Sequence, residues 1–171
     1  GSRRPQARGM ISMAAAAKMT SAVCQPICNS LFGIAAGERA TDWAVETTVQ
    51  LFETVGKTLV LDEARIDALS TISGSGPAYV FYLIEQLTAA AKHHGFNDQD
   101  AALLVNETFL GAAELLLASG KSPEALRKQV TSPNGTTERA IARMAETDLE
   151  SMFIEATDAA LARARELAAG K

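Results

Sequence analysis

The sequence has few bulky side chains. Aromatic residues make up 5% of the chain, although hydrophobic residues make up 47% and 32 residues are alanine. A core with so few large side chains gains its contacts when helix backbones come close together. The composition therefore predicts long, tightly packed helices. With 171 residues, a second domain fits only as a fragment.

The sequence also has few cysteines, and their spacing argues against a metal site. Cys24 and Cys28 are four residues apart and would share one face of a helix. Structural zinc normally takes four ligands, and no second cysteine pair or nearby histidine completes such a set. We therefore predict no metal. The low cysteine content fits a reducing compartment and favours a cytoplasmic location.

An excess of basic charge is absent as well. The formal net charge is −4 and the two signs are interspersed, whereas a nucleic-acid-binding face would be basic. Gly1-Ser2 is typical of a cloning remnant. Residues 3–17 have a weak likeness to a signal peptide, but Lys18 ends the apolar run, and we expect no run as long as a membrane span. The predicted partners therefore exclude nucleic acid and membrane.

Helix signals are clear from Thr41 onward. Thr41 or Asp42 can cap a first helix, with Gly56 in the position after its end. Thr147-Asp148-Leu149-Glu150 fits a capping box at the start of the last helix. Residues 20–33 are also helix-like, and a short apolar run predicts a strand near 58–61. Further helices are expected at about 62–69, 77–94, 97–119, 122–130, 137–145 and 148–168.

The predicted helix 97–119 is apolar nearly all round, with Gly111-Ala112-Ala113 at its centre. Such a helix must be buried on most sides, and small central residues allow a second backbone to approach. One source of that cover is another subunit. We therefore predict an all-α bundle that forms an interlocked homodimer, with residues 77–94 and 98–119 in much of the interface.

Two glycine-containing turns each come directly before a predicted helix. They are Ser73-Gly74-Ser75-Gly76-Pro77-Ala78-Tyr79 and Val130-Thr131-Ser132-Pro133-Asn134-Gly135-Thr136-Thr137-Glu138. A helix N-terminus has unpaired backbone N–H groups at the positive end of its dipole, where a carboxylate or phosphate can bind. Asn134 tolerates the left-handed conformation better than most other residues.

This pair of segments, with its spacing, resembles the C-terminal half of pyrroline-5-carboxylate reductase. The likeness extends from about Thr41 to Leu167, and the family's signature lies at residues 126–146. The resemblance implies a helical dimerisation and substrate-binding domain at 41–171, of the 6-phosphogluconate dehydrogenase C-terminal type. Residues 1–40 stay unassigned, and the family's N-terminal Rossmann domain is absent.

The resemblance implies hydride transfer from NADPH or NADH to the C=N bond of 1-pyrroline-5-carboxylate, a small substrate with one carboxylate, to give L-proline. Thr137 is the implied catalytic residue, with its hydroxyl near the ring nitrogen. The implied substrate-binding residues are Val130, Ser132, Gly135, Thr136 and Thr137. The residues that would choose between the two nicotinamide cofactors, and all cofactor-binding residues, belong to the missing domain. Dimers that assemble into higher oligomers are also compatible with the family.

Plainer explanations exist for each motif. Ser-Pro-Asn-Gly-Thr-Thr is also what a β-turn followed by a threonine-capped helix requires. Gly74-Ser75-Gly76 lacks the third glycine and the following strand of a dinucleotide fingerprint, so it is either a turn facing the active-site cleft or a turn that allows close packing. The pair Arg127-Lys128 is interpreted as a solvated helix face, and His93-His94 as basic residues that suit a helix end.

Two other functions remain open from the sequence. One is a non-catalytic helical dimerisation module that kept the loop. The other is the C-terminal domain of another dehydrogenase of the same plan, acting on a hydroxy or imino acid. Because the chain lacks a phosphate-cradling βαβ unit with a glycine-rich first turn, we expect the isolated chain to be inactive as a reductase.

Overall fold

The computed structural model describes residues 30–170, and these form two compact units. The first contains residues 30–75 together with 167–170, and the second is Gly76–Glu166. Predictions for residues 1–29, which include Cys24, Cys28 and most of the helix-like stretch 20–33, lie outside the described residues. Each unit is described by itself below.

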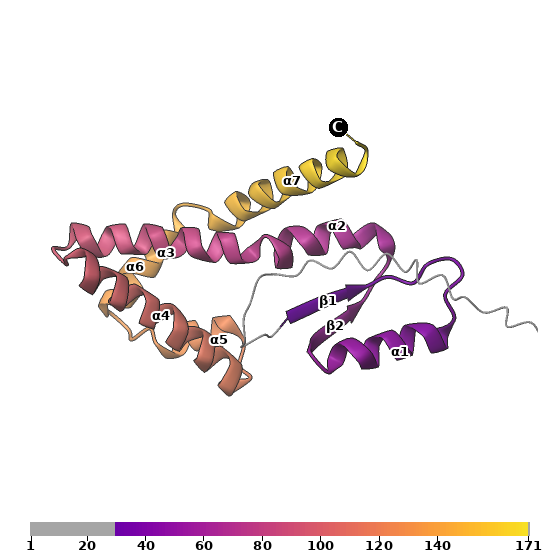
Figure 1. The fold of residues 1–171 in the computed structure, drawn as a ribbon. Coiled ribbons are helices and arrows are strands. Elements are labelled where there is room, and N and C mark those ends of the chain that lie inside the picture. Colours follow the sequence, from indigo (N-terminus) through magenta and orange to yellow (C-terminus); the bar gives the residue numbers. More distant parts are fainter. Residues whose placement is uncertain (1–29, 171) are drawn as a thin grey trace, which may run out of the picture. The chain divides into compact units, whose positions relative to one another are not determined.

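The first unit is built on one strand–helix–strand motif (Figure 1). Strand β1 (Ser30–Ile34) pairs in parallel with β2 (Gly56–Val60), and helix α1 (Asp42–Glu53) connects them. The predicted strand near 58–61 is confirmed. The helical prediction for the end of 20–33 is wrong, because the run from Ser30 pairs with β2 as a strand instead.

Gly56 is the first residue of a strand, whereas we predicted that it follows the end of a helix. Helix α1 has its C-cap at Thr54, and Gly56 opens β2. A Cβ atom on Gly56 would lie 2.3 Å from the backbone oxygen of Ser30 and 2.8 Å from the ring of Phe32. The absence of a side chain therefore allows the two strands to approach. Phe32 also contacts Phe52 of α1, with ring centroids 4.9 Å apart.

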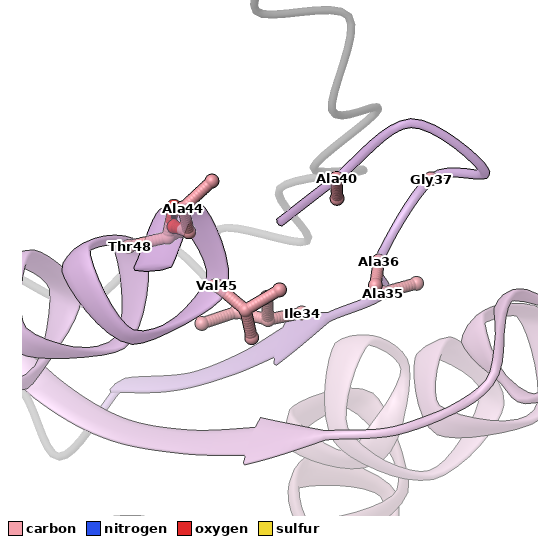
Figure 2. Close-up of a pocket in the computed structure, with 8 residues that line it drawn as sticks. All are labelled: Ile34, Ala35, Ala36, Gly37, Ala40, Ala44, Val45 and Thr48. Atoms are coloured by element: carbon pink, nitrogen blue, oxygen red, sulfur yellow. Dashed lines mark hydrogen bonds between the residues drawn. The ribbon is translucent and has the colours of Figure 1, made fainter. Parts of the chain in front are cut away.

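The carboxyl end of β1 borders a small apolar hollow of about 60 Å³ (Figure 2). Its wall contains Ile34, Ala35 and Ala36 from the strand end and Ala44, Val45 and Thr48 from α1. A space of this size is much smaller than an ordinary small-molecule site of about 300–1,000 Å³. The turn after β1, Ala35-Ala36-Gly37, carries one glycine and no G-x-G-x-x-G fingerprint.

A run of short helical turns follows β2. It consists of the 3₁₀ turn η1 (Glu63–Arg65), α2 (Ile66–Leu69) and the π-type turn η2 (Ser70–Gly74). Ile66 and Thr71 are buried here, and the Thr71 hydroxyl donates to the carbonyl of Ala68 at 2.8 Å. The short helix predicted at 62–69 is confirmed in this broken form.

The second unit is helical throughout, which confirms the all-α prediction. Its helices are α3 (Gly76–His93), α4 (Asp98–Ser119), α5 (Pro123–Gln129), α6 (Thr136–Ala145) and α7 (Leu149–Ala168), whose last residues belong to the first unit. The predicted starts at Asn97 and Ser122 are confirmed, since each side chain accepts from a backbone N–H three residues on.

Helix α7 begins differently from our prediction. Its first turn is held by Asp148, whose carboxylate accepts from the backbone N–H and the hydroxyl of Ser151 at 3.2 and 2.7 Å. These hydrogen bonds lower the pKa of Asp148 below its ordinary value. Thr147 instead donates its hydroxyl to the carbonyl of Met144. The capping box that we predicted from Thr147 and Glu150 is therefore wrong.

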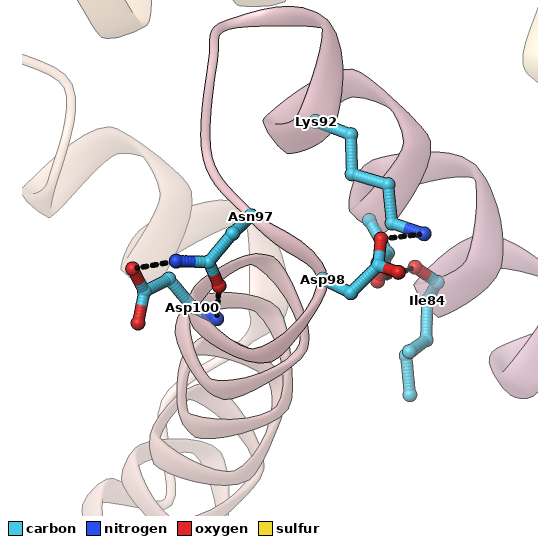
Figure 3. Close-up of polar contacts among 6 residues, drawn as sticks. Ile84, Lys92, Asn97, Asp98 and Asp100 are labelled. Atoms are coloured by element: carbon cyan, nitrogen blue, oxygen red, sulfur yellow. Dashed lines mark hydrogen bonds and ion pairs between the residues drawn. The ribbon is translucent and has the colours of Figure 1, made fainter.

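Helix α4 folds back on α3 through a tight turn at Gly95, whose φ is +95°. Figure 3 shows the contacts at this junction: Lys92 pairs with Asp98 at 2.7 Å, and Asn97 donates to Asp100 at 2.8 Å. The hydrogen bond and the charge of Lys92 hold the pKa of Asp98 below its ordinary value. Ala101 and Val105 of α4 are buried.

Helix α4 also corrects an expectation about apolar runs. Its 22 residues are long and apolar enough to cross a membrane by length and composition, although we predicted no such run. The core helix of a soluble protein meets the same criterion. Leu104 and Leu117 of α4 are 45% and 73% exposed, so much of this apolar surface is uncovered within the chain.

Candidate functional site

The candidate site begins at helix α5, which brings the chain to the second glycine-containing turn. Ser122 caps this helix and Pro123 opens it, as the sequence predicts. Leu126 is buried and fixes the inner face of α5. After the helix ends, the Thr131 hydroxyl donates to the carbonyl of Arg127 at 2.6 Å, which keeps the chain close to the last turn of α5.

Residues 132–135 then form a closed turn. The N–H of Gly135 donates to the carbonyl oxygen of Ser132 at 3.0 Å, and Asn134 has a φ of +60°. Proline followed by a left-handed residue is the pattern of a type II turn. The prediction that Asn134 can adopt this conformation is confirmed. A Cβ atom on Gly135 would lie 3.0 Å from the Ser132 oxygen, so this glycine has little room for a side chain.

Helix α6 starts without a side-chain cap. Gly135 is its N-cap residue, with φ −82° and ψ 172°, and no cap hydrogen bond to a side chain forms there. The explanation of Thr136-Thr137 as capping residues is therefore wrong. Among the described residues, the hydroxyls of Ser132, Thr136 and Thr137 have no hydrogen-bond partner, and neither do the backbone N–H groups of Thr136 and Thr137. These groups can meet a ligand.

An apolar groove of about 570 Å³ runs beside this turn, within the second unit. Helices α3 to α6 all contribute to it. Its lining residues are Val80, Phe109, Ala112, Ala113, Leu115, Leu116, Pro123, Leu126, Arg127, Val130, Thr131, Thr137 and Ile141. The wall is mostly hydrocarbon, with a few polar groups at the end where α5 meets α6. Such a mixture is usual in sites for small molecules.

The structure separates the predicted site residues into two groups. Val130 and Thr137 line the groove itself. Ser132, Gly135 and Thr136 lie in the adjoining turn and are not part of the wall. The N–H of Gly135 is bonded to Ser132, so the backbone donors that could meet a carboxylate begin at Thr136.

The interpretation of Arg127-Lys128 as a solvated face agrees with the structure, because both residues are exposed and Lys128 pairs with Glu124 at 2.6 Å. The sequence did not predict that Arg127 also lines the groove, where no ion pair of its side chain occurs among the described residues. A signal was available: Arg127 precedes Val130 by three residues, and residues three apart lie on the same side of a helix.

The first glycine-containing turn has a different construction. It ends the π-type turn, with the N–H of Ser75 bonded to the carbonyl of Ser70 at 3.0 Å, and α3 begins at Gly76. No described atom lies within 4 Å of a Cβ built on Gly76. Close packing among the described residues therefore does not explain this glycine. That the turn faces an active-site cleft stays a prediction.

A metal centre has no support in the described part of the chain, where no group of three or more His, Cys, Asp and Glu side chains could hold an ion. His93 and His94 lie at the end of α3 with ring centroids 5.4 Å apart. This position agrees with the interpretation that basic residues suit the negative end of the helix dipole.

Comparison with known proteins identifies the class of the helical part. Residues 63–167 match the family model described as pyrroline-5-carboxylate reductase dimerisation. The chain therefore contains a dimerisation domain of the reductase class.

Individual relatives agree with this match. The chain is 42% identical over 137 residues to a pyrroline-5-carboxylate reductase of Pseudomonas aeruginosa, covering 80% of this chain and 50% of the relative. It is 36% identical over 141 residues to pyrroline-5-carboxylate reductase 2 of Bacillus subtilis, covering 82% and 51%. The structure of a pyrroline-5-carboxylate reductase from Coxiella burnetii is similar, with a TM-score of 0.74, 38% identity, and coverage of 80% and 51%.

The chain belongs to the pyrroline-5-carboxylate reductase family. It spans about half the length of the curated relatives it matches.

Proposed function

We propose that the protein carrying this chain is a pyrroline-5-carboxylate reductase, which transfers hydride from NAD(P)H to the C=N carbon of 1-pyrroline-5-carboxylate and so makes L-proline. One observation carries the proposal. The turn at residues 130–138 and the groove beside it lie within the segment matched by the family model. A small ring with one carboxylate needs both an apolar wall and an anion contact, and this place offers both.

The substrate carboxylate binds at the start of α6 in this proposal. The N–H groups of Thr136 and Thr137 point out of the first turn of the helix, where the helix dipole favours an anion. The hydroxyls of Ser132 and Thr136 add donors. Gly135, without a side chain, lets the carboxylate approach the backbone. Val130 contacts the ring.

Thr137 occupies the position that suits the reacting bond. Its hydroxyl has no partner among the described residues and its side chain lines the groove. It can hydrogen-bond to the ring nitrogen, where a proton is held as the amine forms. No strong general acid is needed if the substrate binds as the protonated iminium. Arg127, in the same wall, supplies a positive charge that attracts the carboxylate.

The residues described here do not fit a dinucleotide. The strand–helix–strand motif lacks the glycine-rich first turn, and its hollow of about 60 Å³ is too small. We therefore place nicotinamide binding, and the choice between NADPH and NADH, in another part of the full-length protein. The isolated chain should bind NADPH negligibly and show no reductase activity. Isothermal titration calorimetry checks this, and tight NADPH binding would contradict it.

A homodimer completes the proposal. Beyond the α3–α4 pair, the helices of the second unit make only sparse contacts with one another. Large apolar side chains of α7 stay uncovered, including Met152 and Ile154, which are 46% and 53% exposed. Homodimer interfaces commonly bury surface of this kind. We expect a cytoplasmic protein whose dimers can assemble further.

The deciding experiment is a reductase assay on the full-length protein. NADPH oxidation should depend on added 1-pyrroline-5-carboxylate, and proline should accumulate in equal amount. Turnover of a hydroxy acid or an open-chain imine in place of the cyclic substrate would favour another dehydrogenase of the same plan. A stable dimer that reduces none of these substrates would favour the non-catalytic dimerisation module.

A further inference from the structure

The turn before α6 contains a hydrogen bond that the sequence pattern does not predict. The backbone N–H of Asn134 donates to the carboxylate of Glu138 at 2.8 Å. Glu138 is the third residue of α6, so its side chain reaches back over the first turn of its own helix. In a common capping box, the glutamate at this position accepts from the N-cap residue. Here the N–H of that residue, Gly135, is already bonded to Ser132.

This arrangement decides which donors stay available to a ligand. The turn satisfies the N–H groups of Asn134 and Gly135 internally, one through Glu138 and one through Ser132. The N–H groups of Thr136 and Thr137 have no acceptor among the described residues. A loop whose inner donors are already bonded has less freedom to lose when the substrate binds, and this favours binding.

The Glu138 side chain also has an effect that weakens the binding of an anionic substrate. Its negative charge lies at the positive end of α6, where the proposed substrate carboxylate must bind. Like charges placed near one site repel, so the glutamate lowers the affinity of the turn for an anion. Arg127 is the described positive charge in the groove wall that offsets this repulsion.

We propose that Glu138 is a positioning residue for the substrate carboxylate. Its hydrogen bond to Asn134 keeps that residue in the left-handed conformation and the turn ready for the substrate, while its charge limits how tightly the anionic substrate binds. The inference rests on the proposed reductase function. It assigns no chemical step to Glu138, because that carboxylate is bonded to the backbone and is not among the residues that line the groove.

Two substitutions separate the hydrogen bond from the charge in the full-length protein. Glu138→Gln keeps an oxygen acceptor for Asn134 and removes the charge, so KM for 1-pyrroline-5-carboxylate should fall about two- to fivefold. Glu138→Ala removes both, and KM should rise about fivefold because the turn loses its internal acceptor. In both variants kcat should change by less than about twofold, since Thr137 is untouched.

A matched control is available at the other end of the same helix. Glu146→Gln also removes one negative charge, but Glu146 pairs with Arg143 beyond the last turn of α6, away from the site. KM should stay at the wild-type value in this variant. A rise of KM by the same factor in Glu138→Gln and Glu138→Ala would overturn the proposal, as would an unchanged KM in Glu138→Ala.

A second measurement tests the loop without relying on catalysis. Hydrogen–deuterium exchange of the peptide that contains Asn134 should be faster in Glu138→Ala and close to wild type in Glu138→Gln. Equal exchange in all three proteins would refute the positioning role even if the protein is an active reductase. Conversely, the wild-type protein could lack reductase activity while the variants show this exchange pattern. That result would refute the proposed function but support the role of the Glu138–Asn134 hydrogen bond in ordering the turn.

Discussion

Helices α4 and α6 present their apolar side chains in opposite ways. On α4, the exposed leucines point in several directions around the helix, because Leu103, Leu104 and Leu116 differ by roughly a third of a turn from one another. On α6, Thr137, Ile141 and Met144 follow the three- and four-residue spacing of a single face. The apolar surface of α4 therefore needs packing partners on several sides, whereas that of α6 needs them on one side.

This difference indicates what each helix meets. A surface that is apolar all round needs neighbours on several sides, and among the described residues α3 makes the most extensive contact with α4. Thr137 and Ile141 of the single apolar face of α6 line the groove, and the N-terminus of α6 stays free for a small molecule. The contrast supports the proposal that the start of α6 binds the substrate, and we propose on the same ground that α4 packs against a second chain.

The largest expected effect comes from filling the small centre of α4. No described atom lies within 4 Å of a Cβ built on Gly111, so the described residues leave open space where a side chain would start. If a second backbone approaches at this point, Gly111→Leu should convert the dimer into a monomer at micromolar concentration. Light scattering measures the change, and circular dichroism checks that the helices are retained.

Gly37→Leu is the matched control for that experiment, because a Cβ on Gly37 also meets open space but lies far from α4 in the sequence. It should remain a dimer. If the Gly111→Leu protein stays dimeric, the second subunit does not pack against the small centre of α4. The contrast drawn between α4 and α6 would then be wrong.

The next effect sharpens the role assigned to the start of α6. Gly135→Val would place a side chain 3.0 Å from the Ser132 oxygen and in the path of the substrate carboxylate. Loss of a hydrogen bond to a charged group should raise KM on the order of tenfold to a hundredfold. Gly37→Val is the control, because a Cβ on Gly37 meets open space and this residue is not among those that line the groove. Equal KM values in the two variants would contradict the carboxylate site.

The local sequence predicted most of the second unit, because its helix starts are encoded by single side chains. Asn97 and Ser122 accept the hydrogen bonds that their types and positions predict. The left-handed Asn134 and the strand near 58–61 also follow from local rules. The family resemblance rested on the two glycine-containing turns at 73–79 and 130–138, the second of which contains Asn134.

The rest depended on partners distant in sequence or on competition between neighbours. Strand β1 exists because β2 pairs with it, and its residues alone have helical periodicity. Glycine 56 was assigned to a helix end because the approach of Ser30 is not visible in the sequence. At α7, Asp148 and Thr147 are both good caps, and the choice of Asp148 depended on its two bonds to Ser151.

A smaller effect is expected at Thr137, and it separates catalysis from capping. Because Gly135 is the N-cap and no side chain caps α6, Thr137→Ala should leave the free energy of unfolding within about 0.5 kcal/mol of wild type. Loss of the hydroxyl beside the C=N bond should lower kcat about tenfold. Thr137→Ser, which keeps the hydroxyl, should recover most of the rate. A destabilised Thr137→Ala enzyme with wild-type kinetics would instead favour the dimerisation module.

The smallest effect concerns the start of α4 and depends on pH. The pKa of Asp98 is lowered by its hydrogen bond and ion pair with Lys92, so the folded state favours the charged carboxylate. The stabilisation is therefore present above the ordinary aspartate pKa of about 3.9 and is lost as the pH falls through the lower pKa of the folded state. Asp98→Asn should melt slightly below wild type at pH 7, and the difference should shrink as the pH falls through the lowered pKa of Asp98. Because both side chains are exposed, the difference should also shrink in high salt. A gap in melting temperature that stays constant with pH would show that Asp98 stabilises this junction by something other than its charge.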